Sequence, residues 1–445
     1  MTTRKHSRKK RKQKGIQWFY ITAAGLVFAV IIAAVLFKIR ADNTDSQRLA
    51  GTRASQEIDG AGQQDSAGQT DSLTPAEETG STGPYDEPDS TDTAKIQAII
   101  SRMTLEQKTA QLFIITPEAL TGYPAVTQAG DATCKALQEY PVGGLIYFPQ
   151  NLQSPEQLKT MTARTQEYAS GLDQLPLFLS IDEEGGKVAR IANHEGFRLP
   201  RAETMAEIGK SRDTSRAYEA GSVIGSYLEE FGINLDFAPD ADVLTNPDNT
   251  VVLDRSFGSD PVLVTQMVKA YMQGLEEHHV YGTPKHFPGH GATEGDSHKG
   301  FAYTYKTWDE LEQAELVPFA GLIQDNTPFI MAGHISLPQI TGDDTPSSLS
   351  SQVLTDYLRE TMGYNGIIIT DALNMGAIQD NYPPDRAAVM ALQAGADLLL
   401  MPADFKEAYN GVLDAVKTGE LTEERIDQSL TRILGLKLTL PRHKR

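Results

Sequence analysis

Eight short apolar segments recur along the chain at intervals of roughly 30 to 55 residues. They are rich in Ile, Val, Leu and Phe, and they do not alternate between apolar and polar residues. Strands of this kind are covered on both faces, as in parallel sheets. The segments are residues 111–116, 143–148, 177–182, 234–239, 281–287, 329–335, 366–372 and 396–402, of which the fifth has the lowest apolar content.

Segments with helical character, such as residues 154–172, lie between the predicted strands. Eight strand–helix repeats predict an α/β fold, a (β/α)8 TIM barrel that occupies residues 93–440 as a single domain. The chain length of 445 residues is compatible with such a barrel, and no further domain remains after it. Thr104 and Gln107 predict a capping box for an early helix, and Thr422 predicts the N-cap of the last one.

The first 92 residues differ in composition from the rest of the chain. Residues 1–15 form a basic head, and the next 22 residues, from Ile16 to Phe37, are uncharged, mostly apolar and long enough to span a bilayer. Charged residues follow this run, so we expect an uncleaved transmembrane signal anchor at 16–38. Basic residues ahead of the anchor place the N-terminus in the cytoplasm and the rest outside a bacterial cell membrane. Residues 39–92, rich in Ser, Thr, Gly and acids, are expected to form a disordered linker.

The charge distribution excludes nucleic acid as a partner. Ten of the 40 Lys/Arg residues and none of the 59 Asp/Glu residues lie in residues 1–40, so the remainder carries 30 basic and 59 acidic residues. Such an excess of negative charge repels nucleic acid. Residues 441–445 form a short basic tail, and Cys134 is the only cysteine, which excludes an internal disulfide.

Polar residues lie at the carboxyl ends of five consecutive predicted strands, or soon after them. Active sites of (β/α)8 barrels lie at this end of the strands, so we expect these side chains to converge on one mouth. The residues are Asp182, Asp242, Lys285, His286, His334 and Asp371.

The stretch KHFPGHGATEGDSH, residues 285–298, holds three histidines, two carboxylates and three glycines. One interpretation is a zinc site, because imidazole and carboxylate ligands are numerous enough. However, His286 and His290 flank a Pro-Gly turn and do not share a helix face, as the histidines of an H-E-x-x-H motif do. The side chains of this hypothesis are His286, His290, His298, His334 and Asp371.

A proton relay is the second interpretation of the stretch. A carboxylate at Asp296 that accepts one ring N–H of His298 fixes the tautomer and raises the basicity of the other ring nitrogen. The glycines allow such a loop to bend toward a substrate. The third interpretation is a solvated polar loop, since an Asp-x-His pair by itself is a weak signal.

Asp371 follows the apolar segment GIIIT and is expected at the barrel rim. A carboxylate at this position is either structural, bonded to backbone amides, or a nucleophile that attacks an electrophilic carbon. A nucleophilic carboxylate and a separate proton donor are the two catalytic groups that a retaining glycosidase uses.

Six motifs along the chain together resemble glycoside hydrolase family 3, in its single-domain β-N-acetylhexosaminidase branch. The resemblance covers residues 97–437, and the long histidine stretch is its most specific part. The motifs are IDEEGGKVAR, FAPDADV, LDRSFG, KHFPGHGATEGDSH, MAGHI and ITDALNMGAI.

The resemblance implies a role for each candidate site residue. Asp371 would be the nucleophile, and His298, oriented by Asp296, would be the mobile general acid/base. No metal and no cofactor is implied. The implied ligands of the terminal sugar are Asp182, Arg190, Arg255, Lys285 and His286, and His334 and Asp242 are expected to line the same pocket.

Two positions depart from the family pattern. Ala372 stands where a second Asp often follows the nucleophile, and Lys187 stands where an Arg often follows the double glycine. Lysine cannot reproduce a bidentate arginine contact. Because a histidine replaces the second carboxylate, the distance between carboxylates does not predict the stereochemistry. A neutral base also repels phosphate less than a carboxylate does, which leaves phosphorolysis open.

These features predict a membrane-anchored enzyme that removes terminal β-linked GlcNAc with retention from peptidoglycan fragments or chitooligosaccharides. A phosphorylase of β-N-acetylglucosaminides or another family 3 β-glycosidase is the alternative within the family. A metal-dependent barrel hydrolase would be inactivated by a chelator. A non-catalytic protein that binds cell-wall sugars would need neither Asp371 nor His298. The motifs do not specify the aglycone or the oligomeric state.

Overall fold

The computed structural model describes residues 90–171 and 175–440. The predicted basic head, signal anchor, linker up to residue 89 and basic tail lie outside these residues. No helix within the described ranges is both long and apolar enough to cross a membrane. The first described helix, α2 (Ser90–Ile100), begins within the last residues of the predicted linker. These polar residues form a first helical turn, where an acid such as Asp92 is favourable.

All eight predicted strands are present, and their residues are buried except Tyr281, which is partly exposed. The fifth predicted strand, with the lowest apolar content, keeps only two residues in regular pairing. The eight strands are β1 (Phe113–Ile115), β2 (Gly144–Ile146), β3 (Phe178–Ile181), β6 (Leu235–Asp236), β7 (Tyr281–Gly282), β9 (Phe329–Ala332), β11 (Ile367–Thr370) and β12 (Leu399–Leu400).

The eight strands are parallel and form a curled sheet. Six of them pair in the order β12-β1-β2-β3-β6-β7, and β9 pairs with β11. A bridge between Phe287 and Ala332 connects the β7 side to β9, and a bridge between Ile369 and Leu398 connects β11 to the β12 side. The backbone pairing therefore follows the order that a closed eight-stranded barrel requires.

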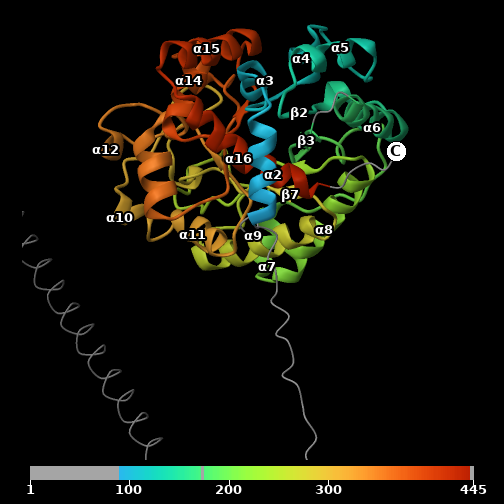
Figure 1. Ribbon diagram of the computed structural model, residues 1–445. Helices are drawn as coiled ribbons and strands as arrows, with labels where there is room; N and C mark the ends of the chain where they lie inside the picture. Colours follow the sequence, from blue (N-terminus) through green and yellow to red (C-terminus); the bar gives the residue numbers. More distant parts are fainter. Residues whose placement is uncertain (1–89, 172–174, 441–445) are drawn as a thin grey trace, which may run out of the picture. The chain divides into compact units, whose positions relative to one another are not determined.

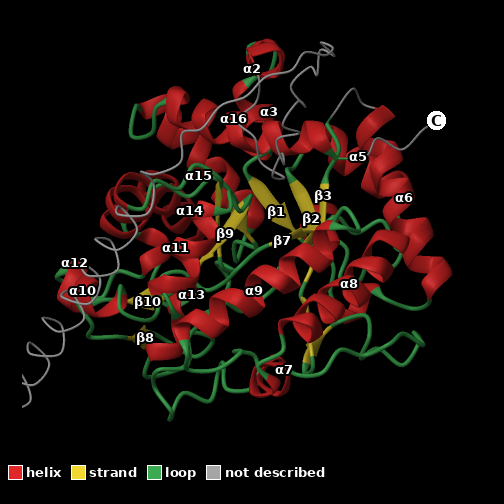
Figure 2. Ribbon diagram, turned by 90° about the horizontal axis from the view of Figure 1, so that it is seen from below, coloured by secondary structure: helices red, strands yellow, loops and turns green. Residues whose placement is uncertain are grey.

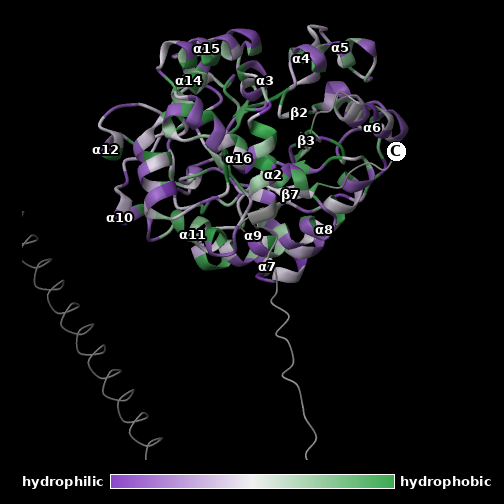
Figure 3. Ribbon diagram, viewed as in Figure 1, coloured by the Kyte–Doolittle hydropathy of each residue, from purple (hydrophilic) through white to green (hydrophobic). Residues whose placement is uncertain are grey.

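Helices surround the strands, which occupy the centre of the view in Figure 2. Many of these helices carry both hydrophobic and hydrophilic residues, as the two colours in Figure 3 show. The helices are α3 (Leu105–Ala110), α4 (Pro117–Thr121), α5 (Asp131–Glu139), α6 (Pro155–Gly171), α7 (Met205–Ser211), α8 (Thr214–Glu230), α9 (Pro261–Glu276), α10 (Trp308–Leu311), α11 (Leu316–Gln324), α12 (Pro338–Thr341), α13 (Gly376–Gln379), α14 (Pro384–Ala394), α15 (Phe405–Thr418) and α16 (Glu423–Thr439).

Shorter elements shape the loops around the sheet. A hairpin of β4 (Glu183–Gly185) and β5 (Val188–Ala189) follows β3 directly. The strands β8 (Ala302–Tyr303) and β10 (Ile335–Ser336) pair outside the main sheet. Three short 3-10 helices and one π-helix complete the fold: η1 (Pro149–Asn151), η2 (His290–Ala292), η3 (Ser347–Leu349) and η4 (Gln352–Thr361).

The predicted caps are confirmed, and the two ends of the described chain meet. Thr104 and Gln107 form the capping box of α3, and Thr422 caps α16 by accepting the Arg425 amide. The helix α2 packs against α16, where Gln97 Nε2 donates to Thr431 Oγ1 at 3.4 Å (Figure 1). These contacts join the first and last helices of the described residues.

Candidate active site

A cavity of about 590 Å³ lies among the loops that follow the carboxyl ends of the strands. Eight of the ten predicted site residues line it, and a larger cavity of about 860 Å³ beside α9 and α11 contains none of them. The eight are Asp182, Arg190, Arg255, Lys285, His286, Asp296, His298 and Asp371. Sequence reasoning did not assign a site role to the other lining residues that the loops supply, among them Phe148, Glu184, Thr250, Val251, Asp254 and Met401.

Asp371 directly follows β11 and is partly exposed to the cavity. Its backbone N–H donates to Ala332 O at 2.8 Å, and the Ala372 N–H donates to its Oδ1 at 2.7 Å. Burial raises the pKa of this carboxyl, but the imidazoles of His334 and His286 and the Ala372 amide outweigh burial and lower the pKa to about 2. The side chain is therefore an ionised carboxylate at neutral pH, with one oxygen fixed by a backbone amide.

His298 is exposed on the loop that follows η2, and its ring contacts Asp296 as predicted. The Nδ1–H donates to Asp296 Oδ1 at 2.9 Å. Because an ionised carboxylate only accepts hydrogen bonds, the neutral ring carries its proton on Nδ1, and Nε2 is left to accept or release a proton. Burial raises the pKa of Asp296, but the hydrogen bonds from His298 and Lys299 lower it below its ordinary value, so Asp296 is anionic.

Two cations, the buried Lys285 and the partly exposed Arg255, meet at Glu184 in the cavity wall. Lys285 Nζ lies 2.7 Å from Glu184 Oε1 and 3.1 Å from Asp182 Oδ1. Arg255 donates from Nε and Nη2 to the two oxygens of Glu184, at 2.8 and 2.7 Å. Burial opposes the charge on Glu184, but Arg255 and Lys285 hold its pKa well below the ordinary value. The four side chains form a rigid charged network that can bind sugar hydroxyls.

Arg190 joins this network at its edge. Its Nη2 lies 3.5 Å from Asp182 Oδ2, and its guanidinium carbon lies 5.8 Å from the centre of the Phe148 ring. The ion pair and the ring together orient a partly exposed guanidinium at the cavity.

Glu184 is the functional residue that sequence reasoning missed. Glu183 and Glu184 follow each other in β4, and side chains of successive strand residues point to opposite sides. Glu183 accepts the Ile191 and Ala192 amides at 2.8 and 2.9 Å, while Glu184 lines the cavity. The two adjacent acids after a buried strand were the available signal, but the sequence does not tell which of them faces the site.

Replacing Glu184 with Gln is expected to lower the free energy of unfolding by about 3 to 5 kcal/mol, because the buried Lys285 and the largely buried Arg255 lose their shared anion. Urea denaturation measures this change. The matched control is Glu230→Gln, which breaks an exposed pair with Lys159 and should change stability by less than about 1 kcal/mol. An equal decrease in the free energy of unfolding in the two variants would contradict a buried charge network around Glu184.

Asp242 and His334 do not line the cavity, which corrects the expectation for both. Each is fully buried. Asp242 Oδ2 accepts the Nδ1–H of His286 at 2.7 Å, and His334 donates from Nε2 to Ala372 O at 3.0 Å while Nδ1 accepts from the Ser348 hydroxyl at 2.7 Å. Burial lowers the pKa of His334, against the opposing effect of the Asp371 carboxylate. Asp242 and His334 therefore hold the His286 ring and the Ala372 backbone, which line the cavity, from the buried side.

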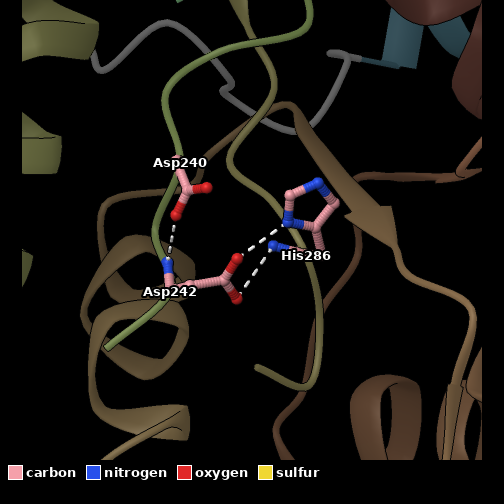
Figure 4. A group of neighbouring side chains, drawn as sticks. All are labelled: Asp240, Asp242 and His286. Carbon is pink, nitrogen blue, oxygen red and sulfur yellow. Dashed lines mark hydrogen bonds and ion pairs between the residues drawn. The ribbon is translucent and has the colours of Figure 1, made fainter. Parts of the chain in front are cut away.

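One group of described side chains has the spacing of a metal site: Asp240, Asp242 and His286, whose ligand atoms lie within 4.8 Å of one another. Figure 4 shows that these groups already bond to each other, since the Asp242 carboxylate accepts from the backbone N–H and the Nδ1–H of His286, and the Asp242 N–H donates to Asp240 Oδ1. Asp240 Oδ2 has no hydrogen-bond partner, but Arg255 Nε lies 3.7 Å away. The guanidinium thus supplies a positive charge at this carboxylate. The other side chains of the zinc hypothesis do not belong to the group: His290, His298, His334 and Asp371.

The cavity combines an ionised carboxylate, a histidine oriented by an aspartate and a buried ion network at the strand ends of a parallel α/β sheet. This combination is typical of a hydrolase of glycosidic bonds. The sequence profile of the glycosyl hydrolase family 3 N-terminal domain matches residues 104–436. The chain belongs to glycosyl hydrolase family 3, and the predicted resemblance is confirmed.

The relatives include β-hexosaminidases. Beta-hexosaminidase A of Pseudoalteromonas piscicida is 36% identical over 338 residues, which are 71% of this chain and 56% of that protein. Beta-hexosaminidase LpqI of Mycobacterium tuberculosis is 35% identical over 354 residues, 77% of this chain and 84% of that protein. A solved family 3 β-N-acetylglucosaminidase from Paenibacillus sp. is 37% identical with a TM-score of 0.70, over 76% of this chain and 62% of that one. The chain thus spans just over half of the Pseudoalteromonas protein.

Proposed function

We propose that this family 3 enzyme is a retaining exo-β-N-acetylglucosaminidase that acts through a covalent glycosyl-enzyme. The observation that carries the proposal is the presence, in one cavity, of the Asp371 carboxylate and the Asp296–His298 pair. The names of its relatives support the sugar specificity, and a (β/α)8 barrel supports the placement of the site at the strand ends.

In the proposed first step, Asp371 attacks the anomeric carbon while His298 protonates the leaving oxygen. The lowered pKa of Asp371 keeps the carboxylate anionic near the positive charge that develops on the sugar ring. His298 donates from Nε2, because Nδ1 is bonded to Asp296. In the second step the neutral His298 removes a proton from water, and the water releases the sugar from Asp371 with overall retention.

The charged network is proposed to hold the terminal sugar. Lys285, Arg255 and Arg190 supply N–H donors, and Asp182 supplies acceptors, to the sugar hydroxyls and the N-acetyl group. Because their charges are paired before the substrate binds, little reorganisation is needed during the reaction. His286, fixed through Asp242, belongs to the same wall.

The cellular setting is also part of the proposal. The apolar run at 16–38 and the basic residues ahead of it support a single-pass anchor in a bacterial membrane, with the enzyme on the outer side. GlcNAc-containing peptidoglycan fragments are the substrates available there. The polar composition of residues 39–92 supports a flexible connection between the anchor and the enzyme.

A phosphorylase is the second candidate, because the proposed acid/base is an imidazole and the cationic side chains Lys187 and Arg190 line the cavity. A neutral imidazole repels an incoming phosphate less than a carboxylate would.

Product analysis with chitobiose and with a peptidoglycan disaccharide tests both candidates. We expect GlcNAc released first as its β-anomer, at a rate that phosphate does not change, as followed by proton magnetic resonance. Formation of a sugar 1-phosphate in phosphate buffer would favour the phosphorylase. Binding of the disaccharide without any turnover would favour the non-catalytic alternative.

A further inference from the structure

The loop of residues 293–300, named here the acid–base loop, carries Asp296 and His298. Glu294 pairs with Tyr303 across the base of this loop, and both of their backbone hydrogen bonds are formed, at 2.8 and 2.9 Å. His298 itself is exposed, so its own packing does not fix its position. Contacts elsewhere in the loop must therefore decide where the imidazole lies.

The inner side of the loop is held by His290. The ring contacts Thr293 Oγ1 from Nδ1 at 2.8 Å and Ser297 Oγ from Nε2 at 3.2 Å. The Thr293 hydroxyl also contacts the His290 carbonyl at 2.9 Å, so one tautomer, with the proton on Nδ1, satisfies all three contacts. Burial lowers the pKa of His290 to about 4, which keeps the ring neutral. The residue just before His298 is thus bonded to a fixed, buried imidazole.

Asn249 fixes the start of the same loop from the segment that follows β6. Its Nδ2 donates to His290 O at 2.8 Å and contacts Thr293 O and Oγ1 at 3.3 and 3.2 Å. Its Oδ1 accepts the amides of Val251 and Val252. The inner side of the acid–base loop is therefore fixed by hydrogen bonds from both His290 and Asn249.

The outer side of the loop rests on α13, the helix that begins five positions after the nucleophile in the sequence. The Ala377 N–H donates to Ser297 O at 3.2 Å. The backbone of Gly376 approaches so closely that a Cβ there would lie 2.8 Å from His298 O and 3.3 Å from His298 C. The backbone of His298 therefore lies directly on the segment that carries Asp371.

We propose that Gly376 is a positioning residue for acid/base catalysis: the absence of its side chain allows the acid–base loop to dock on the nucleophile's own segment, with His290 holding the loop from the opposite side. This inference rests on the proposed function of Asp371 and His298. It adds that the close approach of the His298 backbone to Gly376 helps to set the distance between nucleophile and acid.

The test is Gly376→Ala. The backbone of Gly376 has a conformation that alanine adopts, and alanine is the better helix former at the start of α13, so the helix itself tolerates the substitution and its steric cost falls on the contact with the His298 backbone. The added methyl group instead displaces His298. We expect kcat/KM to fall about 10- to 100-fold for chitobiose, whose leaving group needs a proton, and by less than about threefold for a dinitrophenyl β-GlcNAc, whose leaving group does not.

Two further variants make the result specific. Ser297→Ala removes the contact with His290 and should give the same dependence on the leaving group. Gly130→Ala is the matched control, because a Cβ at Gly130 meets nothing within 4 Å, and it should leave both substrates unaffected. Equal losses on both substrates, or no loss on either, in folded Gly376→Ala protein would overturn the inference. Failure of the proposed function is a separate outcome, in which wild-type protein does not hydrolyse chitobiose or Asp371→Asn keeps its activity.

Discussion

Replacement of Asp371 with Asn is expected to lower kcat on aryl β-GlcNAc substrates by at least about 10³-fold. Asn has the same shape and can still accept the Ala372 amide, so the substitution removes the charge and the nucleophile with little change in packing. The lowered pKa of Asp371 means that the wild-type group is fully ionised throughout the assay range. Steady-state assays on purified, folded variant measure the loss.

The stability of the same variant provides a check that depends on pH. A carboxyl whose folded pKa lies below its unfolded value stabilises the protein above the unfolded pKa, and this contribution disappears as the pH falls through the folded value. Asp371→Asn should therefore be less stable than wild type at neutral pH, with a difference that shrinks toward pH 2. Retained turnover, or a stability difference that grows on acidification, would contradict the assignment.

The second large effect is expected for His298→Ala. A general acid contributes about 10²- to 10⁴-fold, so hydrolysis of chitobiose should fall by that factor. With a dinitrophenyl glycoside the first step needs no acid, but the second still needs a base, so the variant should release a burst of dinitrophenol and then turn over slowly. The change is measured by rapid mixing with both substrates.

The control for His298→Ala is His279→Asn, at an exposed turn after α9 with a positive φ of 56° that asparagine tolerates. It should not alter either substrate's kinetics. A uniform loss across leaving groups in His298→Ala, without a burst, would show that His298 does not transfer the proton.

The main sheet could be predicted because strands that are buried on both faces consist mostly of apolar residues, which are visible in the sequence. Segments 366–372 and 329–335 each begin with a run of Ile, Met and other apolar residues, and residues 367–370 pair with residues 329–332 in the structure. The strand at 281–287 was harder to recognise because four of its seven residues are Thr283, Pro284, Lys285 and His286, which interrupt the apolar run. Its polar residues Lys285 and His286 line the cavity, so this strand lacks a continuous apolar pattern.

The direction of individual side chains was not predictable. Asp242 follows a strand end as Asp182 does, but Asp242 turns inward to His286, whereas Asp182 lines the cavity. His290 belongs to the same short motif as His298, yet it bonds to Thr293 and Ser297 and holds the loop. Such roles depend on which face of the backbone a residue occupies, and irregular loop segments have no period from which to read that face.

The most direct test of the central claim is to trap the covalent intermediate. A slowly released fluorinated β-GlcNAc analogue, incubated with wild-type enzyme and followed by digestion and mass spectrometry, should place one sugar on the peptide that contains residues 366–375, with fragmentation locating it on Asp371. Asp371→Asn should remain unlabelled. A sugar attached to another side chain, or no attached sugar while hydrolysis continues, would contradict the proposed mechanism.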